Sequence, residues 1–133
     1  MAFRTVFKES VLSSPTIYLL TVSAPARCLS PNSRAHWRSV SKAKKKLRGQ
    51  AAVMSRAANA PEPLASASCR ATFYVKCRRR RDGDNALASL KAAFDGLQDG
   101  GLIADDSGLI HHPVRFVVDK EKAGTVELEI TEA

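Results

Sequence analysis

The segment CRATFYVKC, residues 69–77, constrains the fold of this chain most strongly. Its β-branched and aromatic residues are typical of a β-strand. On either side of it, apolar residues recur at helical spacing. The first helical pattern, over residues 35–58, consists of Trp37, Val40, Leu47, Ala51, Met54 and Ala58. The second pattern, which Gly100 and Gly101 should end, consists of Leu87, Leu90, Phe94 and Leu97. We therefore expect a strand between two helices.

Two further patterns complete the expected fold. Ile17–Ser23 is predicted to form the first strand, and Ser33 is the expected cap of the helix that follows it. Val114–Ile130 should form two strands that pair as a hairpin, with a turn near Lys122–Thr125. A length of 133 residues favours one domain with a modest core. The sequence thus predicts one α+β domain over residues 1–133, in the order strand, helix, strand, helix, hairpin, with a mixed sheet. Residues 1–15 are a candidate flexible segment.

The composition excludes several classes of protein. Hydrophobic residues make up 44% of the chain and charged residues 26%, which is ordinary for a soluble globular protein. The apolar stretch Thr16–Ala24 is too short to cross a bilayer and lacks the flanks of a signal peptide. The three cysteines are odd in number and have no C-x-x-C spacing, so we expect small buried or half-buried thiols. These features predict a cytoplasmic protein without a membrane segment.

Charge is distributed unevenly along this chain, whose formal net charge is +8. Residues 1–81 contain 17 Lys and Arg and only two acidic residues, whereas residues 82–133 contain 4 basic and 11 acidic residues. The asymmetry predicts a polyanionic partner, and nucleic acid is favoured over a membrane surface because the basic helix lacks a broad Trp, Phe and Leu face. The alternative is an ordinary solvated helix face. The predicted DNA contacts are Arg38, Lys42, Lys45, Lys46, Arg78, Arg79, Arg80 and Arg81.

Two aspartates follow the arginine run directly. If the strand continued this far, Asp82 and Asp84 would point to the same face, because side chains alternate along a strand. Such a pair suits Mg2+, which one or two carboxylates commonly hold together with phosphate. The alternative is that the two aspartates cap the next helix and interact with its dipole.

A second acidic pair, Asp105 and Asp106, lies in the turn after the second helix, which can bring the chain back toward the first pair. Three carboxylates in one site repel one another, so such a site would require a cation. Lys91 lies seven residues after Asp84, about two turns along the same helix face. There it could stabilise charge on a cleaved phosphate, or remain an exposed helix lysine.

Four stretches in this order are more specific than either acidic pair. They are RRRRDGDN (78–85), LKAAFDGL (90–97), GGLIADDS (100–107) and TVELEITE (125–132). Together they resemble the RusA family of phage-type Holliday junction resolvases. The resemblance covers residues 74–130 well and the N-terminal third loosely. It implies a homodimeric, Mg2+-dependent endodeoxyribonuclease that nicks four-way DNA junctions, with Mn2+ as a candidate substitute for Mg2+.

The same resemblance assigns residues to roles. It places the family's catalytic aspartates, which bind the metal, at Asp82, Asp84 and Asp106, and its helix lysine at Lys91. Asp105 is left as a turn-capping residue. The chain departs from the family in one spacing, because ALASL (86–90) is longer than the family's segment by about one helical turn.

Two alternatives to a junction resolvase stay open. One is a DNA-binding accessory protein that keeps the fold but has no catalytic activity, and the other is a nuclease for flaps or other branched DNA. The remaining aromatic and histidine residues favour structural roles: Trp37 is expected in the core rather than stacked on a base, and His111 and His112 at the surface or a sheet edge.

Overall fold

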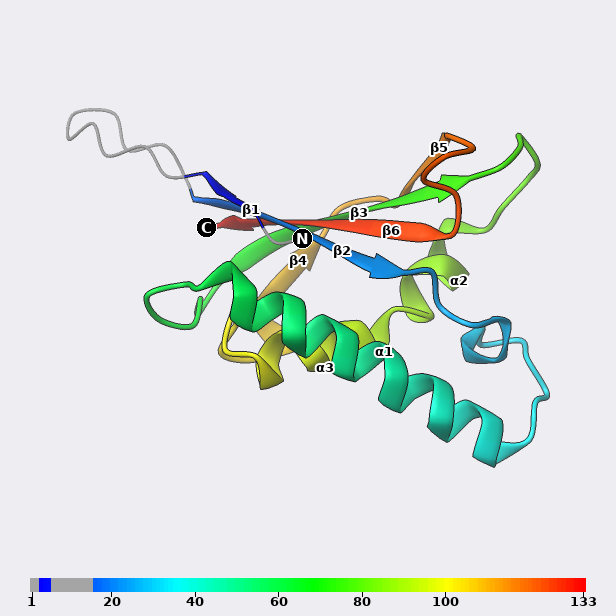
Figure 1. Cartoon of the computed structure of the whole chain (residues 1–133), viewed down its shortest axis with the longest axis horizontal. Helices are drawn as coiled ribbons and strands as arrows, with labels where there is room; N and C mark the ends of the chain where they lie inside the picture. The colour runs from blue at the N-terminus through cyan, green and yellow to red at the C-terminus, as the bar shows by residue number, and fades with distance from the viewer. Residues whose placement is uncertain (1–2, 6–15) are drawn as a thin grey trace.

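The computed structural model describes residues 3–5 and 16–133 and shows an α+β fold with a mixed six-stranded sheet, so this part of the prediction is confirmed. Helices α1 and α3 lie side by side on one face of the sheet (Figure 1). The strands are β1 (Phe3–Thr5), β2 (Ile17–Ser23), β3 (Ala67–Val75), β4 (Leu109–His111), β5 (Arg115–Val118) and β6 (Thr125–Glu132). The helices are α1 (Trp37–Ala58), α2 (Gly83–Ala88), α3 (Lys91–Asp99) and the 3-10 turns η1 (Arg27–Leu29) and η2 (Asp106–Gly108).

Strand β3 occupies the centre of the sheet, whose order is β1-β2-β6-β3-β4 with β5 also paired to β3. Strands β4 and β5 run parallel to successive parts of one edge of β3, and β6 runs antiparallel along the other edge. The predicted hairpin of the last two strands was therefore wrong, because β3 lies between them. Their connection crosses the end of β3, where the N–H of Gly124 (φ 89°) donates to the Tyr74 carbonyl at 3.1 Å.

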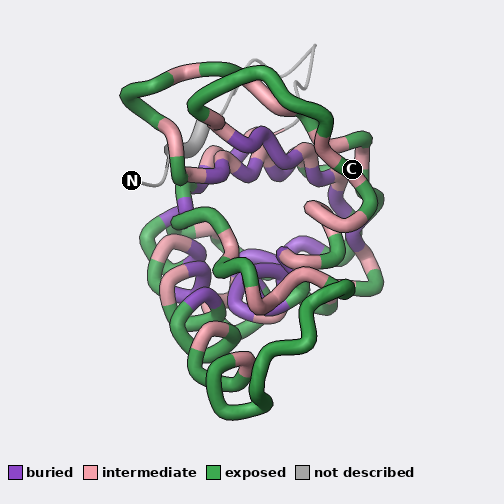
Figure 2. The backbone as a smooth tube through the Cα atoms, turned by 90° about the vertical axis from the view of Figure 1, so that its right-hand side faces the viewer, coloured by how far each residue is buried: buried purple, intermediate pink, exposed green. Residues whose placement is uncertain are grey.

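The core lies between the sheet and the two long helices. Alternate residues of the central strands are buried, as period-two burial requires, and they include Leu20 of β2, Phe73 of β3 and Leu128 of β6. Leu47 of α1 and Leu97 of α3 are buried in the same cluster. Figure 2 shows buried residues along the sheet and on the helices below it.

Helix α1 confirms the predicted helix but not its N-terminal details. The helix begins at Trp37, and its cap is His36, whose Nδ1 accepts a hydrogen bond from the Arg38 N–H at 3.1 Å, rather than Ser33. Trp37 was expected in the core, yet 68% of it is exposed. The apolar stripe continues to Trp37, but the first turns of α1 extend beyond the sheet (Figure 1).

Helices α1 and α3 cross at very short range. A Cβ atom added to Gly96 would lie 2.3 Å from the carbonyl oxygen of Arg48, and one added to Gly100 would lie 2.4 Å from the Cβ of Ser55. The buried Ser55 hydroxyl donates to the Leu97 carbonyl (2.9 Å) and accepts from the Leu102 N–H (3.0 Å), so its polar atoms are satisfied. This crossing fixes α3 against α1.

Two further expectations concern the thiols and the membrane. Burial raises the pKa of the Cys69 thiol to about 12, and Cys28 is partly buried. Cys77 is exposed, so the prediction of a buried or half-buried thiol was wrong for this residue.

Across residues 3–5 and 16–133, no helix combines the length and the apolar character needed to cross a membrane.

The helix crossing predicts opposite effects for two glycine substitutions. Gly96→Ala should lower the free energy of unfolding by about 1–3 kcal/mol, because the added methyl group overlaps the backbone of α1. Gly49→Ala on α1 meets nothing within 4 Å and should raise it by about 0.5–1 kcal/mol, because alanine favours helix. Urea denaturation of both variants measures this difference. Equal stabilities would show that the two helices are not closely packed.

Candidate functional site

The arginine run lies in the loop between β3 and α2. The strand ends at Val75, two residues before the predicted end. Arg81 then folds the loop onto itself, since its guanidinium donates to the carbonyl oxygens of Cys77 (3.0 Å) and Arg79 (3.1 Å). The expectation that a continuing strand would point Asp82 and Asp84 to the same face was therefore wrong.

Asp82 and Asp84 lie instead at the beginning of α2. Asp82 is the N-cap, and its Oδ1 accepts hydrogen bonds from the backbone N–H groups of Asp84 (2.9 Å) and Asn85 (3.2 Å). The alternative that an aspartate caps this helix is thus confirmed for Asp82. Asp84 lies in the first turn, and both carboxylate side chains are exposed.

The helix predicted to carry Lys91 is interrupted. Helix α2 ends at Ala88 and α3 begins at Lys91, with Ser89 and the buried Leu90 between them. The Ser89 hydroxyl donates to the Ala86 carbonyl at 2.6 Å, and Leu90 has φ −90° and ψ 3°. The expectation that Lys91 and Asp84 share one helix face was wrong, because Lys91 begins a separate helix.

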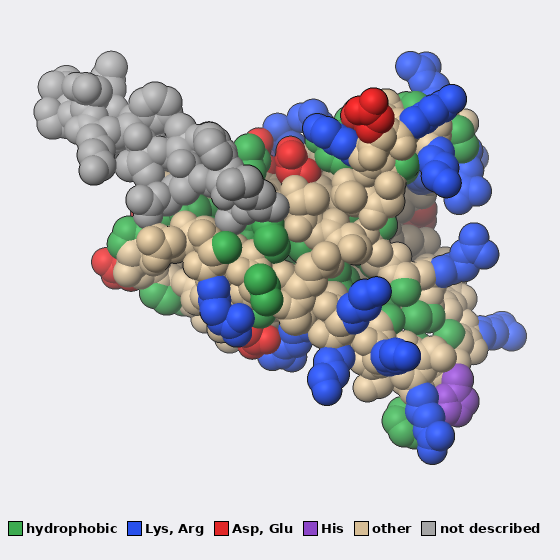
Figure 3. Space-filling view, in the orientation of Figure 1, with side chains coloured by type: hydrophobic (Ala, Val, Ile, Leu, Met, Phe, Trp, Pro, Cys, Tyr) green, Lys and Arg blue, Asp and Glu red, His purple; other side chains and the backbone are tan. Residues whose placement is uncertain are grey.

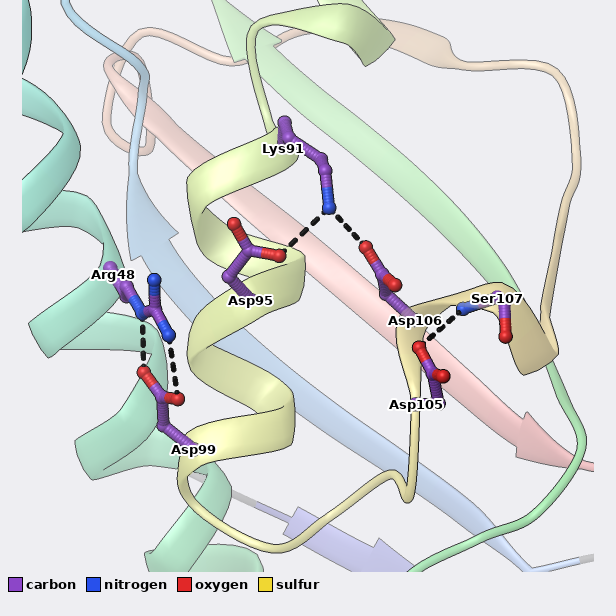
Figure 4. A network of polar contacts seen from close by, with 7 residues as sticks. All are labelled: Arg48, Lys91, Asp95, Asp99, Asp105, Asp106 and Ser107. Atoms are coloured by element: carbon purple, nitrogen blue, oxygen red, sulfur yellow. Dashed lines mark hydrogen bonds and ion pairs between the residues drawn. The ribbon is translucent and has the colours of Figure 1, made fainter.

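Lys91 joins two acidic residues that are distant in the sequence. Its Nζ contacts the carboxylate of Asp106 and donates to Asp95 Oδ1 at 2.8 Å, as Figure 4 shows. The neighbouring Asp105 takes no part in this contact. Its Oδ1 accepts from the Ser107 N–H at 3.2 Å, which confirms the predicted turn-capping role. Of the two adjacent aspartates, Asp106 is the one that faces Lys91.

These contacts shift the pKa values of the groups involved. Hydrogen bonds to Asp106 and then to Asp95 raise the pKa of Lys91. Lys91 in turn lowers the pKa of the Asp106 carboxyl, chiefly through the hydrogen bond between them. Partial burial lowers the pKa of His111, whose ring lies 4.7 Å from that of Phe94, and the charge of Asp106 opposes this effect. The Lys91 ammonium is thus held between Asp95 and Asp106, and partial burial favours the neutral form of the nearby His111 imidazole.

The predicted ligands can be compared with the requirements of Mg2+. In the part of the chain that the structure describes, no three His, Cys, Asp or Glu residues form a group that could hold a metal. Asp82 accepts N–H groups of α2 and Asp106 contacts Lys91. The donor chemistry still fits, because Mg2+ needs only one or two carboxylates when phosphate and water complete its shell. Asp82 and Asp84 could supply the two carboxylates, whereas the carboxylate of Asp106 is paired with Lys91.

The predicted phosphate contacts are exposed, with one exception. Arg81 is half-buried and holds the loop, whereas the exposed cations are Arg38, Lys42, Lys45, Lys46, Arg78, Arg79 and Arg80. Figure 3 shows Lys and Arg side chains along α1 and around the loop after β3. A groove of about 290 Å3 between α1 and α3 connects the basic face of α1 to the candidate site, and it is lined by Lys44, Lys45, Arg48, Lys91, Ala92 and Asp95.

Two residues of the site were missed in the sequence. Asp95 was not singled out, although it lies four residues after Lys91, the spacing at which side chains on a helix meet. Lys44 was not among the predicted contacts, although it lines the groove. His111 was expected at the surface or a sheet edge, which is confirmed by its exposure and by its position in the edge strand β4. No pattern in the sequence predicted its proximity to Asp106.

The ion pair predicts how Asp106 titrates. Lys91→Met should move the carboxyl pKa of Asp106 up toward its ordinary value, because the main cause of the lowering is removed. A carboxyl with a lowered pKa in the folded protein stabilises above its unfolded pKa, and this contribution is lost as the pH falls through the folded value. The stability difference between the wild type and Lys91→Met should therefore be present near neutral pH and disappear in acid.

Carboxyl-carbon NMR as a function of pH measures the titration, with thermal denaturation over the same pH range. Lys120→Met removes an exposed lysine elsewhere and serves as the control, which should leave the Asp106 midpoint unchanged. An Asp106 midpoint that is the same in the wild type and Lys91→Met would show that the two side chains do not pair in solution.

Comparison with known proteins relates this chain to a protein of Xylella fastidiosa. No family model matches the chain. An uncharacterized protein of Xylella fastidiosa (strain Temecula1 / ATCC 700964) is 38% identical over 117 residues, which cover 84% of this chain and 74% of that protein. The chain therefore belongs to the same protein family as this Xylella fastidiosa protein.

Proposed function

We propose that this protein is a Mg2+-dependent endodeoxyribonuclease of the RusA type, which nicks four-way junctions or related branched DNA. One observation carries the proposal: Lys91 and Asp106, fifteen residues apart, contact each other beside a short helix that begins with Asp82 and Asp84. These are the four residues to which the resemblance gives catalytic roles. Contact between two of them was not required by any local pattern.

The departure from the family's spacing is compatible with this proposal. The additional residues lie in Ala86–Leu90, and the break between α2 and α3 falls in the same segment. A continuous helix would have carried Lys91 about one turn further along its axis. Because the helix is interrupted, Lys91 begins α3 and still reaches Asp106.

Different residues of the chain would have different roles in phosphodiester hydrolysis. Asp82 and Asp84 would hold Mg2+, with Asp106 as the third predicted ligand once it is free of Lys91. The ion, when bound, activates water and stabilises negative charge on the reacting phosphate. The Lys91 side chain is exposed and its pKa is raised, so its ammonium could stabilise the same charge beside Asp106.

Contacts to the DNA backbone would come from the exposed cations of α1 and of the loop Arg78–Arg80. Phosphate contacts of this kind position the nucleic acid without reading its sequence. We further propose that the protein acts as a homodimer, because a four-way junction has two equivalent strands and a two-fold dimer can nick both.

A second candidate function is supported by a specific observation. In residues 3–5 and 16–133 no three ligands are gathered, and Asp82 and Asp106 already have protein partners. A DNA-binding protein without catalytic activity would have this arrangement too. The two functions differ in one measurable property, which is cleavage that depends on Mg2+.

Cleavage of synthetic DNA tests the proposal. The wild type should nick a labelled four-way junction with Mg2+ and not in EDTA, with flap and linear duplex substrates showing its preference. Asp84→Asn and Asp106→Asn should each abolish cleavage and leave junction binding intact, because they remove ligands but keep the shape. Asp105→Asn is the matched control, since asparagine also caps turns, and it should keep most of the activity.

Some results would reject parts of this account. Junction binding without cleavage by the wild type under any divalent cation would favour the non-catalytic protein. Cleavage at the wild-type rate by Asp84→Asn would remove the metal assignment while leaving the nuclease in place. Loss of activity in Asp105→Asn with retention in Asp106→Asn would reverse the roles of the two aspartates.

The arginine loop predicts a salt dependence. Affinity for DNA should fall steeply with salt, because each phosphate that a cation neutralises releases counterions. The double variant Arg79→Ala, Arg80→Ala should flatten the slope of log affinity against log salt by roughly one to two units, since each neutralised phosphate adds about 0.9 to the slope. Fluorescence anisotropy in EDTA measures the slope, with Arg56→Ala at the far end of α1 as control. An unchanged slope in the double variant would place the phosphate contacts on α1 instead.

A further inference from the structure

Trp37 is a large apolar side chain that the fold leaves exposed. It is the one tryptophan of the chain, and 68% of it is accessible at the beginning of α1. Large aromatic side chains stabilise a protein mainly through burial, so this residue contributes little to the core. Replacing it should therefore leave the fold intact, and its position calls for a partner outside the chain.

The neighbours of Trp37 form an aromatic and cationic cluster. The ring of His36 stacks on Trp37 with centroids 5.6 Å apart and planes inclined by 29°, and the Arg38 guanidinium lies 5.3 Å from the Trp37 ring centroid. We call His36, Trp37 and Arg38 the Trp37 cluster. The His36 ring is itself held in place, because its Nδ1 caps the helix. The cluster is thus preorganised and not a single mobile side chain.

The surroundings of the cluster are strongly cationic. Arg34, Arg38 and Lys42 are exposed, and within residues 16–133 none of them forms an ion pair with an acidic side chain. Between Ser10 and Pro61 the sequence has no acidic residue. Figure 3 shows a His side chain grouped with Lys and Arg side chains where α1 extends beyond the sheet. An anionic partner is therefore favoured.

The partner must be anionic and must also offer a flat apolar face. An unpaired nucleobase on its phosphate backbone has both properties, and bases stack on aromatic side chains next to basic residues. A membrane surface fits less well, because an interfacial helix needs a broad apolar face. The other exposed large apolar residue of α1, Val53, lies four turns away near its other end.

We propose that the Trp37 cluster stacks on an unpaired base of DNA, while Arg34, Arg38 and Lys42 contact the adjacent phosphates. This inference rests on the proposed function for the identity of the nucleic acid, and it adds a site for single-stranded or branch-point DNA outside the carboxylates. It assigns the preference for unpaired DNA to α1 rather than to the catalytic residues.

The single tryptophan gives a direct readout. Full-length protein in EDTA, where a metal-dependent reaction cannot proceed, is titrated with oligothymidine, with an abasic oligomer of equal length, with duplex DNA and with phosphatidylserine vesicles. Oligothymidine should quench the fluorescence of Trp37 strongly, because stacking on a base quenches the indole. The abasic oligomer has the same charge and no bases, so it should quench far less. Duplex DNA, whose bases are paired, should also quench weakly.

Variants separate stacking from charge. Trp37→Ala should weaken binding of labelled oligothymidine by roughly tenfold and change duplex binding little, whereas Trp37→Phe should recover most of the affinity. Val53→Ala, an exposed apolar residue on the same helix, is the matched control and should bind as the wild type does. Circular dichroism should show equal folding for all four proteins.

Several outcomes would overturn the inference. They are equal quenching by the abasic oligomer, wild-type affinity in Trp37→Ala, and a blue shift with vesicles in the absence of quenching by DNA, which would make the cluster a membrane contact. The outcome is independent of catalysis. If the wild type fails to cut DNA with Mg2+ but Trp37 is quenched by oligothymidine, the nuclease fails and the stacking site stands. The reverse result removes the stacking site alone.

Discussion

The close crossing of α1 and α3 is the constraint on which the candidate site depends. Gly96 and Gly100 allow the backbones to approach to a distance at which no side chain fits. The Ser55 hydroxyl then bonds to the end of α3 and to the chain that leaves it, and Arg48 on α1 holds Asp99 with two hydrogen bonds. Helix α3 is thereby fixed at its C-terminal half. Its first residue, Lys91, is consequently held where the turn after α3 brings Asp106.

Basic residues from the first half of the sequence and acidic residues from the second half meet at this crossing. Most cations come from α1 and the loop after β3, and the carboxylates of the candidate site come from the beginning of α2, from α3 and from the turn before β4. Lys91 belongs to the acidic half of the sequence, yet it lines the same groove as Lys44 and Lys45. A DNA backbone bound to α1 would therefore reach the acidic cluster through a cationic groove. This arrangement suits a protein that must hold a polyanion next to its own carboxylates.

Local patterns in the sequence predicted the individual elements well. Strand β2 was placed at its observed bounds, and α1 within two residues, because strand alternation and helical spacing depend only on neighbours in the chain. Partners in the sheet depend on distant residues. The last two strands were therefore predicted as a hairpin, although both pair with β3. The break before Lys91 was missed because Leu87 and Leu90 keep an apolar spacing whether or not the helix is continuous.

The site was predicted only in part, because some of its contacts are local and others join residues that are distant in the sequence. The capping roles of Asp82 and Asp105 follow from local hydrogen bonds and could be anticipated as alternatives. The Lys91–Asp106 contact depends on the return of the chain after α3. That return was anticipated, and the resemblance gave both residues catalytic roles, but their direct contact was not predicted. Trp37 lies on the apolar stripe of its helix, but the sequence does not show where the sheet beneath that helix ends.

The central claim is that the acidic turns before α2 and after α3 serve one divalent cation. Paramagnetic broadening by Mn2+ in amide NMR spectra tests it directly, because broadening reports distance to the bound ion. Substoichiometric Mn2+ should broaden the amides of residues 82–85 and those around Asp106 together, at the same Mn2+ concentration, before any others. Broadening of only one turn, or general broadening over the acidic residues of β6, would contradict a shared metal site.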